Sequence, residues 1–292
     1  MKILVTGING LVGNALDRLL SETNHNTLNT SRTLDGIAQE KLDITSVSEI
    51  DKIFDDFKPD AVINSAAMAD VDLCEDKKEQ CWEINVNGVK NLIRACKMYD
   101  SHLVHISTDY IFDGTKEGGL YTEEDTPNPQ GYYAKSKLEG ENTILASDIS
   151  HSILRTILVY GKHKNHNIVT FVKENLEKGQ NVNLVDDQVR MPTFVDDLAG
   201  ACIVSAERRA KGIFNVCGPE QMSYLEIGSR IAKHFSLDTN LINHVKTKDL
   251  NQKAKRPYKT GFDLSKSSKI LMLLNHDFLL LQTLEIQQNL FD

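Results

Sequence analysis

The protein has 292 residues, and its 33 lysines and arginines against 41 aspartates and glutamates give a net charge of −8. A chain that is 40% hydrophobic and 25% charged, with only 6 prolines, is neither disordered nor fibrous and predicts one or two globular domains. The acidic excess, with no block of lysine and arginine, argues against nucleic acid as a partner.

Cysteine usage and hydropathy bear on the compartment. The 5 cysteines include no CxxC pair, so we expect no zinc knuckle and no disulfide framework, and a reducing environment. The apolar run at residues 2–6 is too short for a signal peptide, and polar residues interrupt the apolar stretch at 270–281 well before the ~20 residues that span a bilayer. We therefore predict a cytoplasmic protein without a membrane partner.

Strand-like and helix-like hydrophobic periods alternate along the first 160 residues. The predicted strands are 2–6, 60–64, 102–107 and 153–160, and the predicted helices are 12–20, 46–57, 89–96 and a segment that begins near 132. Repeated strand–helix–strand units require right-handed crossovers, and so a parallel sheet with helices on both faces. The sequence therefore predicts a Rossmann-type, doubly wound α/β fold.

The pattern loosens after residue 161. Helices are predicted at about 168–178 and 223–235, and short strands near 181–185 and 213–216. We therefore expect a dinucleotide-binding domain at residues 1–160. Residues 161–292 would form mainly a smaller substrate-binding region, of which segments at about 190–216 return to the first domain.

Three glycines, Gly7, Gly10 and Gly13, lie between the first predicted strand and helix. Glycines at this point allow a tight turn and bring the backbone close enough for a pyrophosphate to meet the helix N-terminus, which predicts a dinucleotide site. The segment at residues 27–33, where a further strand after the first predicted helix would end, has no acidic residue for a ribose hydroxyl but offers Ser31 and Arg32 to a 2′-phosphate, which favours NADPH. A solvated surface arginine is the alternative interpretation.

Asp43 and Ile44 follow the next strand-like segment, where they would flank an adenine. A helix-entry aspartate explains Asp43 equally well.

Tyr133 and Lys137 are four residues apart, so a helix presents both on one side. A neighbouring cation lowers the pKa of a phenol from about 10 and makes it a usable acid or base. Thr108 and Asp109 follow the predicted strand 102–107, where open α/β sheets bind ligands, and the Thr108 hydroxyl would bond the substrate oxygen that Tyr133 protonates. A surface lysine is the alternative interpretation of Lys137.

Together these motifs resemble the extended short-chain dehydrogenase/reductases, and most closely the dTDP-4-dehydrorhamnose reductases, from the first residues to about 270. The segments that carry the resemblance are Gly7 to Gly13, Asn64 to Ala67, Ser107 to Gly114, Tyr133 with Lys137, Arg155 to Gly161, Asp187-Gln188 with Pro192-Thr193, and Arg256-Pro257 with Phe262 to Lys266.

The resemblance implies a reaction: hydride transfer from NADPH, or NADH, to the C4 ketone of a nucleotide-linked 6-deoxy-hexulose. By the same resemblance Tyr133 donates the proton, Lys137 holds the nicotinamide ribose and Thr108 bonds the reacting oxygen. The family contacts its cofactor at positions equivalent to Leu11, Val12, Ala66, Ala67 and Met68, and its sugar near Val71 and Asp109. The resemblance also implies a homodimer.

One departure from the family's pattern leaves more than one function open. Arg190 stands where many family members have glycine, and a branch with arginine there includes the β regulatory subunit of methionine adenosyltransferase. The alternatives are therefore another nucleotide-sugar reductase or epimerase, or a non-catalytic regulatory subunit. Arg190, Lys255 and Arg256 are candidates for a substrate diphosphate, and we interpret His163 and His166 as surface residues rather than a metal site.

Overall fold

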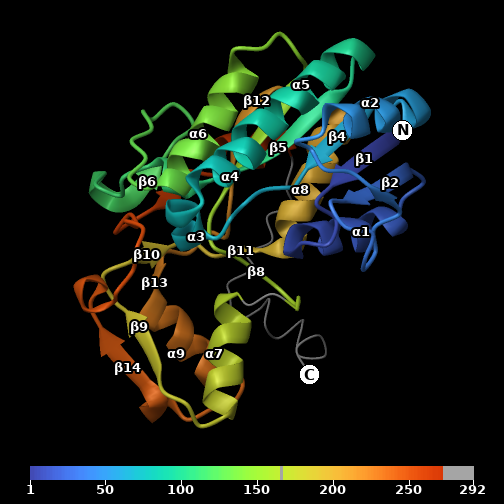
Figure 1. Ribbon diagram of the computed structural model, residues 1–292. Helices are drawn as coiled ribbons and strands as arrows, with labels where there is room; N and C mark the ends of the chain where they lie inside the picture. Colours follow the sequence, from blue (N-terminus) through green and yellow to red (C-terminus); the bar gives the residue numbers. More distant parts are fainter. Residues whose placement is uncertain (165–166, 272–292) are drawn as a thin grey trace.

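A seven-stranded parallel sheet forms the larger part of the molecule in the computed structural model, which describes residues 1–164 and 167–271 (Figure 1). The strand order is β12-β7-β5-β4-β1-β2-β3, with bounds Gly212–Val216, His151–Thr156, His102–Thr108, Ala61–Asn64, Lys2–Thr6, Asn26–Ser31 and Glu40–Lys41. The order reverses on either side of β1, as in a doubly wound sheet, so the predicted Rossmann-type fold is confirmed.

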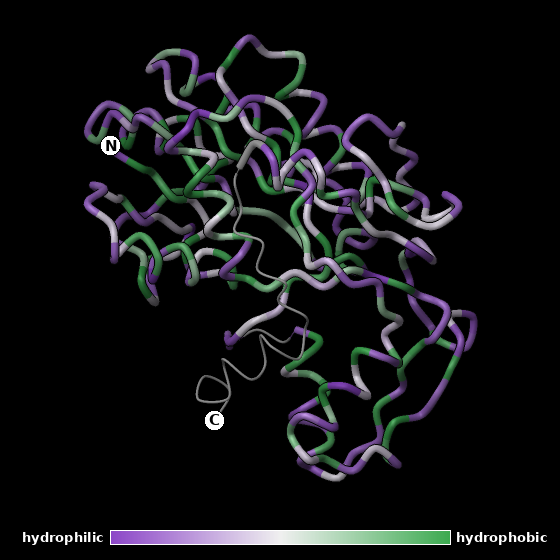
Figure 2. The backbone as a smooth tube through the Cα atoms, turned by 180° about the vertical axis from the view of Figure 1, so that it is seen from behind, coloured by the Kyte–Doolittle hydropathy of each residue, from purple (hydrophilic) through white to green (hydrophobic). Residues whose placement is uncertain are grey.

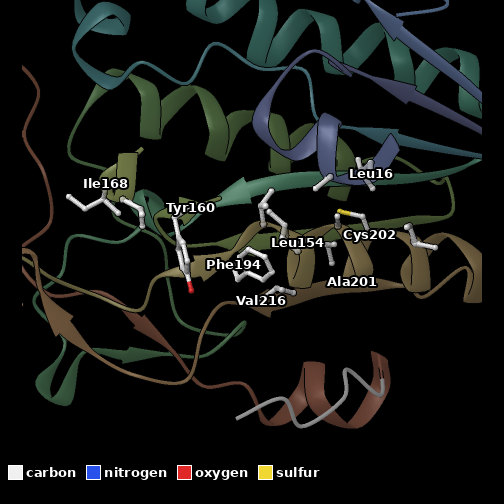
Figure 3. Packing of buried hydrophobic residues seen from close by; sticks show 14 of the residues in the cluster. Leu16, Leu154, Tyr160, Ile168, Phe194, Ala201, Cys202 and Val216 are labelled. Carbon is white, nitrogen blue, oxygen red and sulfur yellow. The ribbon is translucent and has the colours of Figure 1, made fainter. Parts of the chain in front are cut away.

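Helices cover both faces of this sheet, and the alternation of strand side chains explains why. Ile3 and Val5 face one core and Leu4 the other. Helices α1 (Leu11–Ser21) and α8 (Val195–Arg208) cover the first face; α2 (Val47–Phe57), α5 (Gly88–Tyr99) and α6 (Tyr132–Leu145) cover the second. Figure 3 shows Leu16, Leu154 and Cys202 in the first core, where burying each large side chain contributes about 1.5–3 kcal/mol.

A smaller lobe lies beside the carboxyl ends of the strands (Figure 1). It contains α7 (Ile168–Glu177), α9 (Tyr224–His234) and the parallel pair β9 (Val182–Val185) and β14 (Ile242–Val245). The chain crosses between the lobes more than once, since α8 and β12 both belong to the larger one. In Figure 2 the hydrophobic segments run through the interior of the larger lobe.

Short elements complete the part of the chain that the structure describes. They are α3 (Val71–Asp76), α4 (Lys78–Trp82), α10 (Ser265–Leu271), β6 (Leu120–Tyr121), β8 (Val159–Tyr160), β10 (Val189–Arg190), β11 (Thr193–Phe194), β13 (Met222–Ser223) and β15 (Gly261–Phe262). None of the described helices combines the length and the apolar character needed to cross a membrane.

Two local predictions need correction. The strand expected at 153–160 is broken into β7 and β8, because Leu158 adopts a φ of 40°. The sequence Ser46-Val-Ser-Glu49 has the form of a capping box, but only half of one is formed: the Ser46 hydroxyl accepts from the Glu49 amide, whereas the Glu49 carboxylate accepts from the Asp43 amide and from Lys41. Glu49 thereby ties the start of α2 to the preceding segment.

Candidate active site

A cavity of about 550 Å³ opens at the carboxyl ends of β1, β4, β5 and β7 and extends to the smaller lobe. This is the edge at which open α/β sheets bind ligands. The predicted site residues that line it are Gly10, Leu11, Val12, Gly13, Ala66, Ala67, Val71, Thr108, Asp109, Tyr133, Lys137 and Arg190. Residues predicted separately for cofactor and substrate thus meet around one space.

The close backbone approaches of the glycine turn are possible only because Gly7 and Gly13 lack side chains. Gly7 has a φ of +71°, and a Cβ there would lie 2.7 Å from the Ala66 amide nitrogen. A Cβ on Gly13 would lie 2.3 Å from the Ile8 carbonyl oxygen. The turn therefore packs closely on β4, and Gly10, the N-cap residue of α1, lies at the cavity wall. This geometry fits a dinucleotide pyrophosphate.

Tyr133 enters the cavity from the first turn of α6, opposite Thr108 at the end of β5. Burial raises the pKa of Tyr133, while its hydrogen bond with Thr108 acts in the opposite direction. The Tyr110 ring contacts the Tyr133 ring edge-on, with centroids 6.1 Å apart. The phenol is therefore protonated near neutral pH, the state that an acid requires.

Lys137 lies one turn further along α6 and is held by β5. Its Nζ donates to the Ile106 carbonyl at 2.7 Å and lies 3.1 Å from Nε2 of His105. Burial lowers the pKa of Lys137 to about 8, although Glu141 acts to raise it. We expected the ammonium to lower the pKa of Tyr133; in the structure that direction comes from Thr108, because Lys137 is turned toward β5.

Asp109 and Arg190 form a buried pair at the side of the cavity nearest the smaller lobe. Burial raises the pKa of Asp109. The Arg190 charge, whose Nε lies 3.6 Å from the carboxylate, acts to lower that pKa but does not outweigh burial. Three N–H groups of Arg190 donate to the carbonyls of Val189, Tyr258 and Pro257. The buried Nε has no hydrogen-bond partner.

The remaining predicted cofactor residues are not among those lining the cavity. Gly7 begins the glycine turn but does not line the cavity; Ser31 ends β2, and Arg32 after it is exposed. Asp43 accepts hydrogen bonds from Thr45. Ile44 and Met68 are buried, and the Met68 backbone is bonded to the Asn85 side chain.

Two other predicted cations lie in the smaller lobe. Arg256 is paired with Asp72 at 2.8 Å and lines a second cavity of about 220 Å³. That cavity shares Ile168 and Tyr224 with the first, so the two are neighbours. Lys255 is exposed.

Of the two histidines predicted to lie at the surface, the structure describes one. His163 bonds the Asn9 carbonyl oxygen, whereas His166 lies outside the described residues. Among the residues that the structure describes, no cluster of histidine, cysteine and acidic side chains could hold a metal ion.

Comparison with known proteins identifies the family to which the chain belongs. The family model "RmlD substrate binding domain" matches residues 1–279. The chain belongs to the RmlD substrate binding domain family. A dTDP-4-dehydrorhamnose reductase from Aggregatibacter actinomycetemcomitans is 32% identical over 277 residues, 91% of each chain. The predicted family resemblance is thereby confirmed.

Two further relatives bear on cofactor and function. The crystal structure of dTDP-4-dehydrorhamnose reductase from Bacillus anthracis in complex with NADP superimposes with a TM-score of 0.83, at 27% identity over 91% of each chain. Methionine adenosyltransferase 2 subunit beta from Xenopus tropicalis is 30% identical over 92% of this chain and 82% of its own. The chain therefore has relatives named as an enzyme and as a subunit.

Several residues that line the cavity of this RmlD-family chain were not assigned to the site from the sequence. They are Tyr110, Thr156, Leu158, Val159, Asn167, Ile168 and Tyr224. Thr156 ends β7, so its position at a strand end was a usable signal. Asn167 and Tyr224 open helices of the smaller lobe, and only the tertiary fold brings them to the sheet.

Proposed function

We propose that the protein is an NADPH-dependent reductase that converts the C4 ketone of dTDP-4-dehydrorhamnose, a nucleotide-linked 6-deoxy-hexulose, to an alcohol. The observation that carries the proposal is the convergence of Thr108, Tyr133 and Lys137 on the cavity into which the glycine turn also opens. A phenol with a raised pKa beside a hydroxyl supplies the acid that ketone reduction requires.

The chain's own residues bind, orient and protonate. The Tyr133 hydroxyl transfers its proton to the C4 oxygen, and the Thr108 hydroxyl holds that oxygen by a hydrogen bond. When bound, NADPH supplies the hydride that reduces the carbon. The Lys137 ammonium has one N–H group beyond those that face His105 and the Ile106 carbonyl, and this group would hold the nicotinamide ribose. Positioning of the two reactants accounts for much of the expected rate.

The cofactor would extend from this point along the glycine turn. We assign the pyrophosphate to the backbone at Gly10 to Gly13, with Gly7 required for the close approach to β4, and the neighbouring walls to Ala66 and Ala67. The adenine end would lie toward Asp43 and Ile44, with Met68 held behind the wall. Ser31 and Arg32, at the end of β2, would receive the 2′-phosphate.

The sugar nucleotide would occupy the side of the cavity that faces the smaller lobe. Val71, Asp109 and Arg190 line the cavity, and Nε of Arg190, which makes no hydrogen bond and lies 3.6 Å from the Asp109 carboxylate, would donate to a ligand oxygen there. This assignment gives residues 1–160 mainly to the cofactor and most of the remaining chain to the substrate. It also explains how a chain of net charge −8 binds a diphosphate, through a few placed donors.

A direct spectrophotometric assay distinguishes the proposed reductase from a regulatory subunit. Purified protein should oxidise NADPH, seen as loss of nicotinamide absorbance, only when dTDP-4-dehydrorhamnose is present. The 30% identity to a methionine adenosyltransferase subunit favours a second candidate, a regulatory subunit. That role predicts no oxidation and stable co-purification with a methionine adenosyltransferase.

The cofactor preference should depend on Arg32. Arg32→Ala removes the exposed cation at the end of β2, and we expect the KM for NADPH to rise about tenfold, the value of one charge-assisted hydrogen bond. The KM for NADH, which lacks the 2′-phosphate, should not change. Equal effects on both cofactors in steady-state kinetics would place the 2′-phosphate elsewhere.

The pH dependence should follow Lys137. Its pKa is lowered to about 8, so the ammonium is present below that pH and is lost as the pH rises through it. We therefore expect kcat/KM for NADPH, which reports the free enzyme, to fall about tenfold per pH unit above 8. A profile that stays flat to about pH 10, the ordinary lysine value, would remove Lys137 from the cofactor site.

A further inference from the structure

A buried chain of hydrogen bonds leads from the sheet to Lys137. The Thr6 hydroxyl lies 2.6 Å from Oδ1 of Asn64, Nδ2 of Asn64 lies 3.0 Å from Nδ1 of His105, and Nε2 of His105 lies 3.1 Å from Nζ of Lys137. All four residues are at most 2% exposed. Strand register sets the chain, because Thr6 is paired with Asn64 and Asn64 with His105 across β1, β4 and β5.

The protons in this chain are coupled. Burial, and then the Lys137 charge, hold the pKa of His105 well below its usual value, so the imidazole is neutral and carries one N–H. A neutral imidazole donates through one nitrogen and accepts through the other. An ammonium at Lys137 needs an acceptor at Nε2, which puts the imidazole proton on Nδ1 and requires the Asn64 oxygen to face it.

The reverse direction of these hydrogen bonds is compatible only with an uncharged Lys137. When the Asn64 amide nitrogen faces Nδ1, as the structure has it, Nε2 carries the proton and donates to Lys137, which must then be an uncharged amine. A half-turn of the Asn64 amide, with the Thr6 hydroxyl reversing its bond, exchanges the two arrangements in nearly the same space. The Nε2–H tautomer of His105 is therefore open only to an uncharged Lys137, which couples the tautomer to the lysine charge.

We propose that His105, oriented by Asn64, is a positioning residue that holds Lys137 at the cavity wall and favours its charged form by accepting from it. The inference rests on the proposed function, because it matters for catalysis only if Lys137 binds the cofactor. Besides His105 on β5, the ionisable groups that act on Lys137 are Glu141 on α6 and Cys81 on α4. Glu141 is already bound by Arg155, so the neutral acceptors within hydrogen-bond distance of the Lys137 Nζ are the Ile106 carbonyl and, in its Nδ1–H tautomer, Nε2 of His105.

Two substitutions separate hydrogen bonding from packing. His105→Leu removes the acceptor, so the charged form of Lys137 loses a hydrogen bond and the alkaline fall of kcat/KM for NADPH should begin about one pH unit lower, a tenfold change in proton affinity. His105→Gln keeps an acceptor and should restore most of the shift. If His105→Leu does not fold, the positioning role is still tested by the pH profile of His105→Gln against that of the native protein, and by the NMR titration of the histidine rings described below.

His102 provides a matched control. It lies on the same strand, is equally buried, and has both ring nitrogens bonded, to the hydroxyls of Ser150 and Ser152. His102→Leu should lower stability as much as His105→Leu without moving the pH profile. Equal shifts in both variants, or no shift in His105→Leu, would overturn the positioning role.

Nitrogen-15 NMR of the histidine rings tests the coupling without a sugar substrate. The His105 signals, assigned by their loss in His105→Gln, should show the Nδ1–H tautomer below about pH 8 and the Nε2–H tautomer above it. A single tautomer across this range would overturn the inference. A native protein that shows the tautomer change and binds NADPH but reduces no sugar would instead refute the proposed function and leave the inference standing.

Discussion

Tyr133→Phe should lower kcat by about 10²- to 10⁴-fold, the range expected when a positioned general acid is lost. The substitution removes one oxygen from a ring that the cavity already encloses, so the fold should persist. Binding of NADPH should be nearly unchanged, because Lys137 and the glycine turn remain. Stopped-flow measurement of NADPH oxidation, with fluorescence titration of NADPH binding, separates the two effects.

The neighbouring Tyr132 provides the control. Its ring packs against Trp82, with centroids 6.3 Å apart, and it does not line the cavity. Tyr132→Phe should therefore retain native turnover. A Tyr133→Phe protein as active as the Tyr132→Phe protein would show that another group protonates the substrate.

Glu141→Leu should lower the free energy of unfolding by about 3–5 kcal/mol, the largest stability effect we expect from one substitution. Glu141 and Arg155 are buried, with side chains 0% and 3% exposed, and three hydrogen bonds join them. The variant leaves the Arg155 guanidinium beside Phe112 and the Glu123 carbonyl, without an opposite charge. Urea denaturation at constant pH measures the loss.

A second substitution distinguishes an unpaired charge from lost packing. The double variant Glu141→Leu/Arg155→Met removes both charges and should recover much of the stability, because burying two charges costs desolvation energy. Asp148→Asn breaks the exposed Lys97–Asp148 pair and should cause no measurable change. A double variant less stable than Glu141→Leu alone would mean that Arg155 stabilises the protein mainly through contacts other than the carboxylate.

The sequence predicted the sheet well because its signal is local. Each of β1, β4 and β5 is a short apolar run bounded by turn or cap residues, and the helices between them carry one apolar face. The Tyr133–Lys137 pair and the glycine turn were found because their spacing has meaning within a single helix or turn.

Features that depend on tertiary contacts were missed. The positive φ of Leu158 ends β7 although the run from residue 153 to 160 is apolar enough for one strand. His105 follows the apolar Leu103 and Val104 in β5, and only strand register reveals that it faces Asn64. Tyr224 reaches the cavity from the second lobe, which no local pattern signals.

The most direct test of the central claim is hydride transfer itself. The protein is incubated with dTDP-4-dehydrorhamnose and NADPH deuterated at the transferable C4 position, and the sugar product is analysed by mass spectrometry. We predict one deuterium in the product, bound at the sugar C4. Absence of product, or a reduced sugar without the deuterium, would contradict the assignment of Thr108, Tyr133 and Lys137 to a reductase site.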